Sequence, residues 1–228
     1  MKFTDRLFKA IEPVWNSYLE HPFVKGIGEG TVDKEKFIHY MKQDYVYLIE
    51  YSRVFAIGSS KANDLHTMTI FANLLHGTMN FEMDLHREYA ERFGISNKEL
   101  EETEPSATMT AYTSYMISQS QRGGVENAIA AVLACAWSYN WIGKTLAKWP
   151  GALEHELYGD WVKMYSSEGF TKIAEDCKAL INDISKTKSE DELKRLEDIF
   201  VRTSYFEYMF WDMAENISTW PVKELAYS

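Results

Sequence analysis

The chain has 228 residues, of which 46% are hydrophobic and 14% aromatic, so it can bury a sizeable core and is not expected to be disordered. Its 24 basic side chains against 34 acidic ones give a formal net charge of −10, which opposes phosphate backbones and argues against a nucleic-acid partner. The two cysteines form no CxxC pair, a pattern that fits a reducing cytoplasm.

No segment of the sequence has the features of a membrane span or of a secretory leader. Residues 1–15 are amphipathic and lack the apolar core that a signal peptide needs. The longest charge-free runs contain Asn, Ser, Thr and Gln between charged flanks, so they indicate buried helices rather than membrane spans. We therefore expect a cytoplasmic protein with no membrane partner.

The first part of the chain contains stretches whose apolar residues recur at helical spacing. These stretches predict helices over residues 4–21, 31–61 and 63–94, and the glycine-rich segment 23–30 is predicted to be a loop. The candidate N-cap residues of the three helices are Thr4 or Asp5, Thr31 or Asp33, and Asn63 or Asp64.

The second part continues the helical pattern. Its predicted helices are a short one from Ser96, one from Ser106 to Gly123, one that carries Cys135 and stops at Trp149, two over residues 152–166 and 170–185 separated by Gly169, and a long last one from Ser189. Ser96 and Ser189 are each followed three residues later by glutamate, which is the capping-box pattern. Because no strand-like alternation appears, we predict an all-α helical bundle that forms a single domain over residues 1–228.

Cys135 lies in the most apolar stretch of the chain, residues 125–148, and Tyr139 follows one helical turn later on the same face. A buried cysteine usually packs as a small hydrophobic residue. It becomes a nucleophile only as the thiolate, which needs a hydrogen-bond donor or a positive field nearby. No His or Lys is adjacent in the sequence, so any activating group has to come from another helix.

Glu207 lies in an aromatic run, residues 203–214, where burial would raise the pKa of its carboxyl. A carboxyl group that is protonated near neutral pH can serve as a general acid. The alternative is a glutamate that points outward or pairs with a base such as Arg202.

Asp44 and Tyr47 share a helix face at a spacing of three residues. An ionised aspartate that faces a cavity could bind an amino group or a ring nitrogen, whereas the alternative is a solvated charge. Tyr112 and Tyr165 lie in aromatic-rich segments and would, taken alone, be assigned to the core.

His66, His76 and His86 are ten residues apart, and Glu82 precedes His86 by one helical turn. Such a set could form one wall of a metal site, as in helical di-iron proteins. No second Glu-x-x-His is present, and the set lies in a stretch with a polar face, so neither a metal nor another cofactor is expected.

Six separated segments carry a resemblance to a known family. They are residues 21–31 (HPFVKGIGEGT), 40–48 (YMKQDYVYL), 85–96 (LHREYAERFGIS), 111–116 (AYTSYM), 132–143 (VLACAWSYNWIG) and 203–214 (TSYFEYMFWDMA). In this order they resemble the TenA family, or thiaminase II, over nearly the whole chain. The resemblance implies a heme-oxygenase-like helical bundle, a homotetramer, and a hydrolase of aminopyrimidines. The implied substrates are thiamine and 4-amino-5-aminomethyl-2-methylpyrimidine.

The resemblance also implies roles for particular residues. Cys135 matches the nucleophile of the branch that uses cysteine, and Glu207 matches the proton donor. The substrate-binding residues that it implies are Asp44, Tyr47, Tyr112, Tyr139 and Tyr165. Tyr47 falls where a side chain is thought to tune the cysteine. The implied mechanism is protonation of a ring nitrogen by Glu207 and addition of the Cys135 thiolate to a ring carbon.

The sequence leaves two alternative functions open. The first is a heme or di-iron oxygenase on the same scaffold, which the lack of a convincing ligand set disfavours. The second is a protein that binds a pyrimidine without turnover and acts in regulation, and the acidic charge balance disfavours its direct contact with DNA.

Overall fold

The computed structural model describes residues 2–222, and every regular element in that range is a helix. The α-helices are α1 (Phe3–Glu20), α2 (Pro22–Glu29), α3 (Lys34–Lys61), α4 (Leu65–Gly77), α5 (Met83–Phe93), α6 (Asn97–Glu101), α7 (Ala107–Arg122), α8 (Val125–Leu146), α9 (Gly159–Ser166), α10 (Glu168–Ser185) and α11 (Glu190–Glu215). A π-helical turn, η1 (Thr78–Glu82), joins α4 to α5. The predicted all-α class is confirmed for these residues. The predicted domain boundaries also include residue 1 and residues 223–228, which lie outside the described part.

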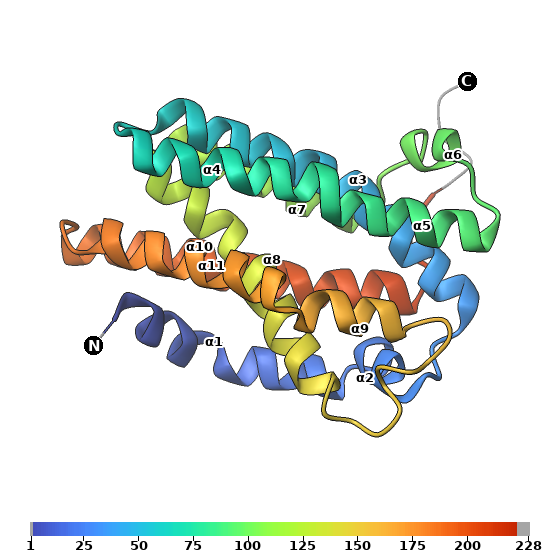
Figure 1. Cartoon of the computed structure of the whole chain (residues 1–228). Helices are drawn as coiled ribbons and strands as arrows, with labels where there is room; N and C mark the ends of the chain where they lie inside the picture. The colour runs from blue at the N-terminus through green and yellow to red at the C-terminus, as the bar shows by residue number, and fades with distance from the viewer. Residues whose placement is uncertain (1, 223–228) are drawn as a thin grey trace.

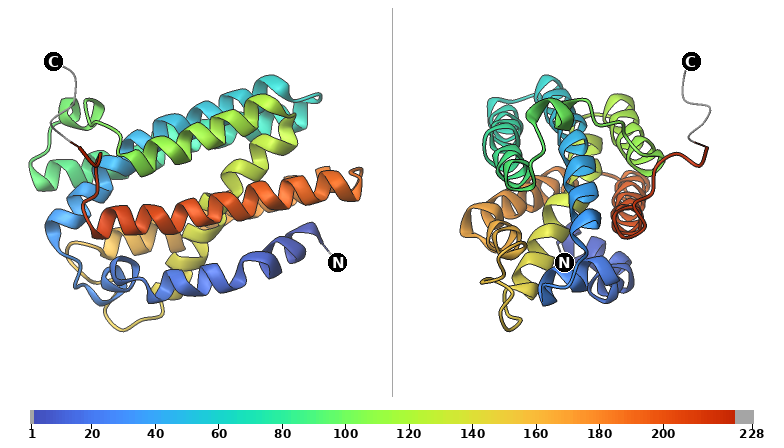
Figure 2. Two further views of the ribbon diagram at one scale, coloured as in Figure 1. Left: turned by 180° about the vertical axis from the view of Figure 1, so that it is seen from behind. Right: turned by 90° about the vertical axis from the view of Figure 1, so that its right-hand side faces the viewer.

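The helices form two layers with one helix between them (Figure 1). Helices α3, α4, α5 and α7 make one layer, and α1, α9, α10 and α11 make the other. Helix α8 crosses obliquely from the first layer to the second, as the views from behind and from the side also show (Figure 2). It contacts α11, α10, α9, α7 and α3, so residues on α8 can meet side chains from both layers.

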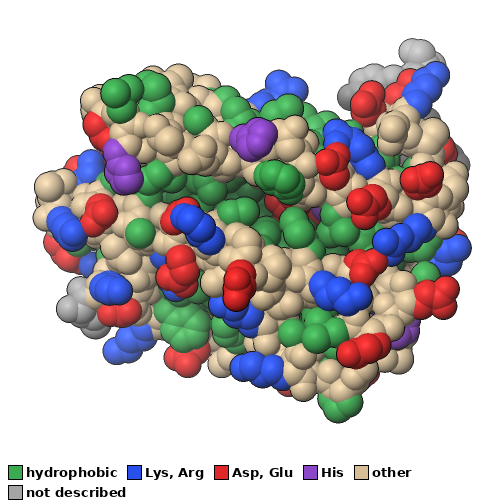
Figure 3. Space-filling view, in the orientation of Figure 1, with side chains coloured by type: hydrophobic (Ala, Val, Ile, Leu, Met, Phe, Trp, Pro, Cys, Tyr) green, Lys and Arg blue, Asp and Glu red, His purple; other side chains and the backbone are tan. Residues whose placement is uncertain are grey.

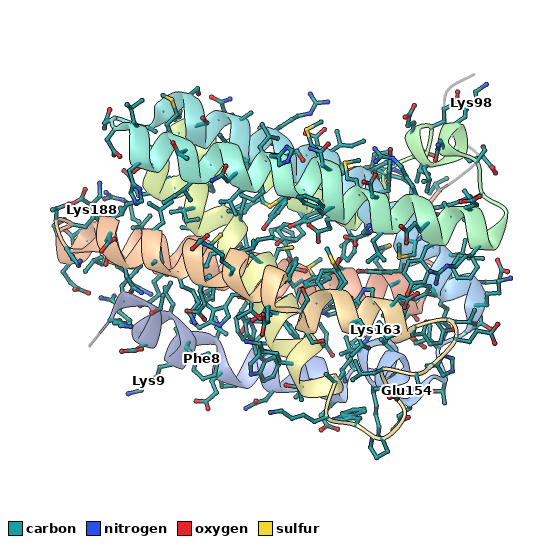
Figure 4. The ribbon with its side chains drawn as sticks, viewed as in Figure 1. Phe8, Lys9, Lys98, Glu154, Lys163 and Lys188 are labelled. Atoms are coloured by element: carbon teal, nitrogen blue, oxygen red, sulfur yellow. The ribbon has the colours of Figure 1, made fainter. Side chains whose placement is uncertain are left out.

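The crossing helix α8 is the most enclosed element of the bundle. Residues 128–136 are all buried, which confirms the interpretation of this apolar stretch as an enclosed helix. Side chains fill the space between the helices, while Lys98 and Glu154 lie at the periphery (Figure 4). Any chemistry on α8 therefore takes place away from bulk water.

Several predicted helix starts are confirmed by their caps. The Asp33 carboxylate accepts hydrogen bonds from the amides of Glu35 and Lys36, and Asp64 and Ser106 cap α4 and α7 in the same way. Both predicted capping boxes, at Ser96 and at Ser189, are formed. The start of α1 differs from the prediction, because Lys2 is the N-cap and the Asp5 side chain accepts from its backbone amide.

The predicted loop over residues 23–30 is wrong, because this segment forms α2. Pro22 at the first helical position already has the required φ, and the His21 ring accepts a hydrogen bond from the Phe23 amide. Of the three glycines, only Gly30 needs its conformational freedom, since it ends the helix with φ of 72°.

Two further boundaries were predicted wrongly. The helix expected over residues 152–166 is limited to α9, and residues 151–154 form turns that begin at Gly151, whose φ is 78°. Gly169 lies inside α10 and does not separate two helices, because Ser167 caps α10 by accepting from the Phe170 amide. The long helix predicted over residues 63–94 is present in three parts, since η1 interrupts it.

Candidate active site

Cys135 on α8 and Glu207 on α11 meet in the interior of the bundle. Their exposed fractions are 5% and 1%. The thiol of Cys135 lies near enough to the carboxyl of Glu207 that each group shifts the pKa of the other. Two groups from helices far apart in the sequence therefore form one local unit.

Two tyrosines support this unit from the first layer of helices. The hydroxyl of Tyr112 on α7 donates to Oε1 of Glu207 at 2.5 Å. The hydroxyl of Tyr47 on α3 lies 3.3 Å from that of Tyr112 and 3.6 Å from the sulfur of Met116, and Tyr47 also lowers the pKa of Cys135. Since a phenol has one proton, Tyr47 donates to one of these neighbours at any one time.

Burial sets the protonation of both groups. Burial, with the charges of Glu207, Glu82 and Asp44, raises the pKa of Cys135 well above its ordinary value, although the interaction with Tyr47 lowers it. Burial also raises the pKa of Glu207 to about 8, although the interactions with Tyr112 and Cys135 lower it. At neutral pH the resting sulfur is a thiol, so the thiolate that the implied mechanism uses has to form during the reaction.

Asp44 on α3 lies beside a buried histidine on α5. Nε2 of His86 is 2.7 Å from Oδ2 of Asp44, and Nδ1 of His86 is 2.9 Å from the carbonyl oxygen of Glu82. Both ring nitrogens face acceptors, so the imidazole carries two protons and a positive charge. Burial lowers the pKa of His86, but the hydrogen bond and charge of Asp44 outweigh it, and the pKa is raised overall.

A hydroxyl and an indole complete the surroundings of Asp44. The hydroxyl of Tyr40 donates to Oδ2 of Asp44 at 3.0 Å, and Nε1 of Trp161 donates to the Tyr40 oxygen at 3.1 Å. Tyr40 also lies 3.4 Å from the hydroxyl of Tyr139. Asp44 is thus held in one orientation by side chains from three helices, α3, α5 and α9.

Glu82 is a third buried carboxyl in the same region. It ends the π-helical turn η1, and its exposed fraction is 7%. The hydroxyl of Tyr165 on α9 donates to its Oε1 at 3.0 Å. Burial and the charge of Asp44 raise the pKa of Glu82 to about 7, although His86 and Tyr165 act in the opposite direction.

Aromatic rings line the space around these groups. Tyr139 packs edge-on to Tyr165 with centroids 4.8 Å apart and lies 5.1 Å from Trp211. On the other side, Phe206 stacks on Tyr112 at 5.2 Å. Such walls suit a flat heterocycle and exclude water from it.

The structure therefore brings together all seven residues that the sequence singled out, but it adds others. Glu82, His86, Tyr40 and Trp161 also belong to the cluster, and sequence reasoning did not assign them to it. The available signal was the pair Glu82 and His86, which was considered as one wall of a metal site and set aside because its stretch has a polar face. Both side chains are in fact buried, at 7% and 1% exposed.

The three histidines do not act together. His66 and His76 are exposed on α4, whereas His86 faces the interior. Among residues 2–222 no group of three or more His, Cys, Asp or Glu side chains could hold a metal ion. No helix within this part of the chain is long and apolar enough to cross a membrane.

One face of the molecule is hollowed. The space-filling view shows an apolar recess along the seam between the α4–α5 ridge and α9 with α10 (Figure 3). The acidic and basic side chains lie mostly around it. An apolar recess of this kind suits the approach of a small, flat molecule.

Comparison with known proteins adds independent information. The TENA/THI-4/PQQC family matches residues 8–216. An aminopyrimidine aminohydrolase of Halalkalibacterium halodurans is 50% identical over 96% of this chain and 98% of its own length. A protein of the same name from Helicobacter pylori is 40% identical over 94% of this chain and 99% of its own, and one from Bacillus subtilis is 34% identical over 96% and 92%.

Solved structures share the fold. A TenA homologue from P. horikoshii is 28% identical, with a TM-score of 0.87 over 95% of this chain and 99% of that one. A domain from Shewanella denitrificans, described as having a heme oxygenase-like fold, is 14% identical, with a TM-score of 0.74 over 94% and 92%. This likeness confirms the predicted heme-oxygenase-like architecture.

Proposed function

The chain belongs to the TENA/THI-4/PQQC family, and we propose that it is an aminopyrimidine aminohydrolase that uses Cys135 as its nucleophile. Three relatives of that name are 50%, 40% and 34% identical to it and match it over nearly their full length. The chain is therefore a hydrolase of thiamine salvage. Its reaction converts 4-amino-5-aminomethyl-2-methylpyrimidine and water to the 5-hydroxymethyl compound and ammonia. With thiamine, the thiazole is released instead.

The observation that carries the covalent mechanism is the contact between the Cys135 thiol and the Glu207 carboxyl. Both groups hold a proton at neutral pH, so Glu207 can give its proton to a ring nitrogen while it receives the proton of the thiol. The sulfur then forms a bond to a ring carbon without a free thiolate in the resting site. A base that is already in contact with the nucleophile is the usual arrangement in covalent catalysis.

The remaining steps follow from the adduct. Addition of sulfur makes the ring electron-rich, and its electron pair expels the group on the exocyclic methylene. Water adds to the exposed methylene carbon, the sulfur–carbon bond breaks, and the ring recovers its aromaticity. Asp44 holds the amino edge of the ring in this scheme, and its orientation is supported by His86 and Tyr40.

The direct test is kinetic comparison of the two substrates with identification of the products by mass. We expect both to give the 5-hydroxymethylpyrimidine, one with ammonia and the other with the thiazole. Binding of pyrimidine without turnover of either compound would instead favour the regulatory alternative. Iron or a heme absorbance in active protein would favour an oxygenase.

We also propose a homotetramer, as the resemblance implies. Large apolar side chains are exposed along α4 and η1, at Leu65, Met68, Met79 and Phe81. Their exposed fractions run from 39% to 79%, which is typical of a surface that another chain covers. Trp220 is also 43% exposed, whereas Trp149 is half-buried against the core and offers less surface. Light scattering in solution tests the assembly.

A cytoplasmic location stays a prediction. It rests on Cys135 and Cys177, which are both free thiols in the structure. Small-molecule pyrimidines remain the expected partners, and no nucleic acid is expected.

A further inference from the structure

We propose that Glu82 binds the positive charge of the leaving group, so that it selects substrates with a cationic substituent on the exocyclic methylene. This inference rests on the proposed aminopyrimidine hydrolysis and deepens it. The proposed mechanism uses Glu207 for the ring nitrogen and Asp44 for the amino edge. It gives no task to the third buried carboxyl.

Glu82 belongs to the same buried cluster as Cys135, because its hydrogen-bond partner Tyr165 packs against Tyr139, one helical turn after Cys135 on α8. Its charge is one of the causes that raise the pKa of Cys135, next after that of Glu207. It comes from η1, whereas Asp44 comes from α3 and Glu207 from α11. The three carboxyls therefore face the same region from three different elements.

The carboxyl of Glu82 is only partly satisfied by the protein. Oε1 accepts the hydrogen bond from Tyr165, and no hydrogen bond to Oε2 is present among residues 2–222. Oε2 is not one of the fully buried polar atoms that lack a partner in this range, so it borders open space although the residue is only 7% exposed. A ligand can therefore donate to it.

No cation of the described part of the chain is hydrogen-bonded to the carboxyl of Glu82, although the charge of His86 acts on it from nearby. The imidazolium of His86 bonds to Asp44 through Nε2 and to the Glu82 carbonyl, not its carboxyl, through Nδ1. None of the lysine or arginine side chains in the described part of the chain is buried. An ionised carboxylate without a partner is costly in the interior, and a cationic ligand removes that cost.

Both substrates supply such a cation at the same position. The aminomethyl compound is a primary amine, which is protonated at neutral pH, and thiamine carries a thiazolium ring. The Tyr165 ring, whose hydroxyl donates to the carboxyl, packs edge-on to Tyr139, and aromatic rings of this kind are favourable neighbours for positive charge. The hydroxymethyl product has no charge there, so it binds more weakly and leaves.

The chemistry is consistent with this placement. When the carbon–nitrogen bond breaks, the electron pair stays on nitrogen, so an ammonium group leaves as neutral ammonia and needs no further proton. Glu82 holds the amine in its ammonium form until that step. After departure its carboxylate is again without a partner, which favours binding of the next cationic substrate.

The π-helical turn explains how Glu82 reaches this place. The wider turn at Thr78–Glu82 shifts the register between α4 and α5, and Glu82 and His86 face inward together at a spacing of four residues. π-Helical turns inside α-helices occur frequently at functional sites. A continuous α-helix would present a different set of side chains to Cys135.

The test compares two ligands that differ in charge but hardly in size. Binding of the aminomethyl and hydroxymethyl pyrimidines is measured by calorimetry in Cys135→Ser protein, which cannot turn over. When Glu82→Gln is added, we expect the affinity for the aminomethyl compound to fall about 10- to 100-fold, which is the scale of one charged hydrogen bond. The affinity for the hydroxymethyl compound should fall less than about threefold. Glu88→Gln, which removes an exposed charge from α5, is the matched control and should change neither.

The outcomes separate this inference from the function itself. Equal weakening of both ligands, or of neither, would overturn the role of Glu82 while leaving the aminohydrolase intact. Loss of binding of both pyrimidines in the Cys135→Ser parent would instead contradict the proposed function. If Glu82→Gln does not fold, Glu82→Asp is the substitute, because it keeps the charge and retracts it by one methylene. We expect the same selective loss of affinity for the aminomethyl compound.

Discussion

The thiol of Cys135 and the carboxyl of Glu207 lie together in the interior of the bundle, where each shifts the pKa of the other. Burial raises the pKa of both groups, so each holds its proton at neutral pH. Neither group is reactive alone under these conditions, because the sulfur is not a thiolate and the carboxyl is a weak acid. Their contact lets one proton move as another is taken up, which couples nucleophilic attack to protonation of the ring.

The first prediction concerns the acid itself. Glu207→Gln keeps the size of the side chain and still accepts from Tyr112, but it can neither donate a proton to the ring nor accept the thiol proton. We expect kcat/KM to fall about 100- to 10,000-fold, the usual scale of acid–base help. Asp198→Asn, an exposed change on the same helix, is the control. A rate within a few-fold of the wild type would contradict the role of Glu207.

A second prediction concerns pH. The reaction needs Glu207 protonated, so kcat/KM should decline as the pH rises through about 8, where the pKa of Glu207 lies. The Tyr112 hydrogen bond lowers that pKa, so Tyr112→Phe should move the decline to higher pH. A pH–rate profile of both proteins checks the direction. If the decline in kcat/KM moved to lower pH in Tyr112→Phe, the decline would reflect the ionisation of a group other than Glu207.

The third prediction concerns stability. The pKa of Glu207 is raised on folding, so the folded protein binds more protons than the unfolded chain between about pH 4.5 and pH 8, and stability falls as pH rises through this range. Glu207→Gln removes a charge that has to form in the interior at high pH. We expect a higher melting temperature than the wild type at pH 9 and little difference at pH 5. The opposite order would indicate that the carboxylate is well stabilised in the fold.

The fourth prediction concerns the nucleophile. Cys135→Ser should abolish turnover while pyrimidine binding is retained, because the hydroxyl replaces the thiol without a large change in volume. Mass spectrometry of the wild type, stopped during turnover, should show an adduct on the peptide that contains Cys135. The buried thiol of Cys177 lies outside the cluster, and Cys177→Ala should keep turnover. Near-normal rates in the serine variant would end the covalent scheme.

The fifth prediction concerns the buried imidazolium. His86→Leu leaves Asp44 without its cation and removes a hydrogen bond of 2.7 Å. We expect the affinity for the neutral hydroxymethylpyrimidine to fall about tenfold or more, together with a loss of stability, since one partner of a buried pair is left uncompensated. If stability falls but affinity is unchanged, His86 serves only the fold. Titration calorimetry and thermal unfolding of the same samples separate the two results.

The helical class and most helix starts could be predicted from local patterns. Capping boxes at Ser96 and Ser189 involve residues three positions apart, so sequence spacing alone specifies them. The enclosed character of α8 follows from its unbroken apolar composition. The segment at residues 23–30 was predicted wrongly, because its glycines were read as loop signals although Pro22 and the His21 ring start a helix there.

The cluster around Cys135 depends on contacts between distant segments, and the sequence by itself determined only its members on each helix. Which carboxyl meets the sulfur, and which one pairs with His86, is decided by how α8 crosses between the two layers and how η1 turns Glu82 inward. The protonation states are also tertiary properties, because they result from burial and from charges on other helices. A single chain position specifies a side chain, whereas its pKa and its partners are set by the packed structure around it.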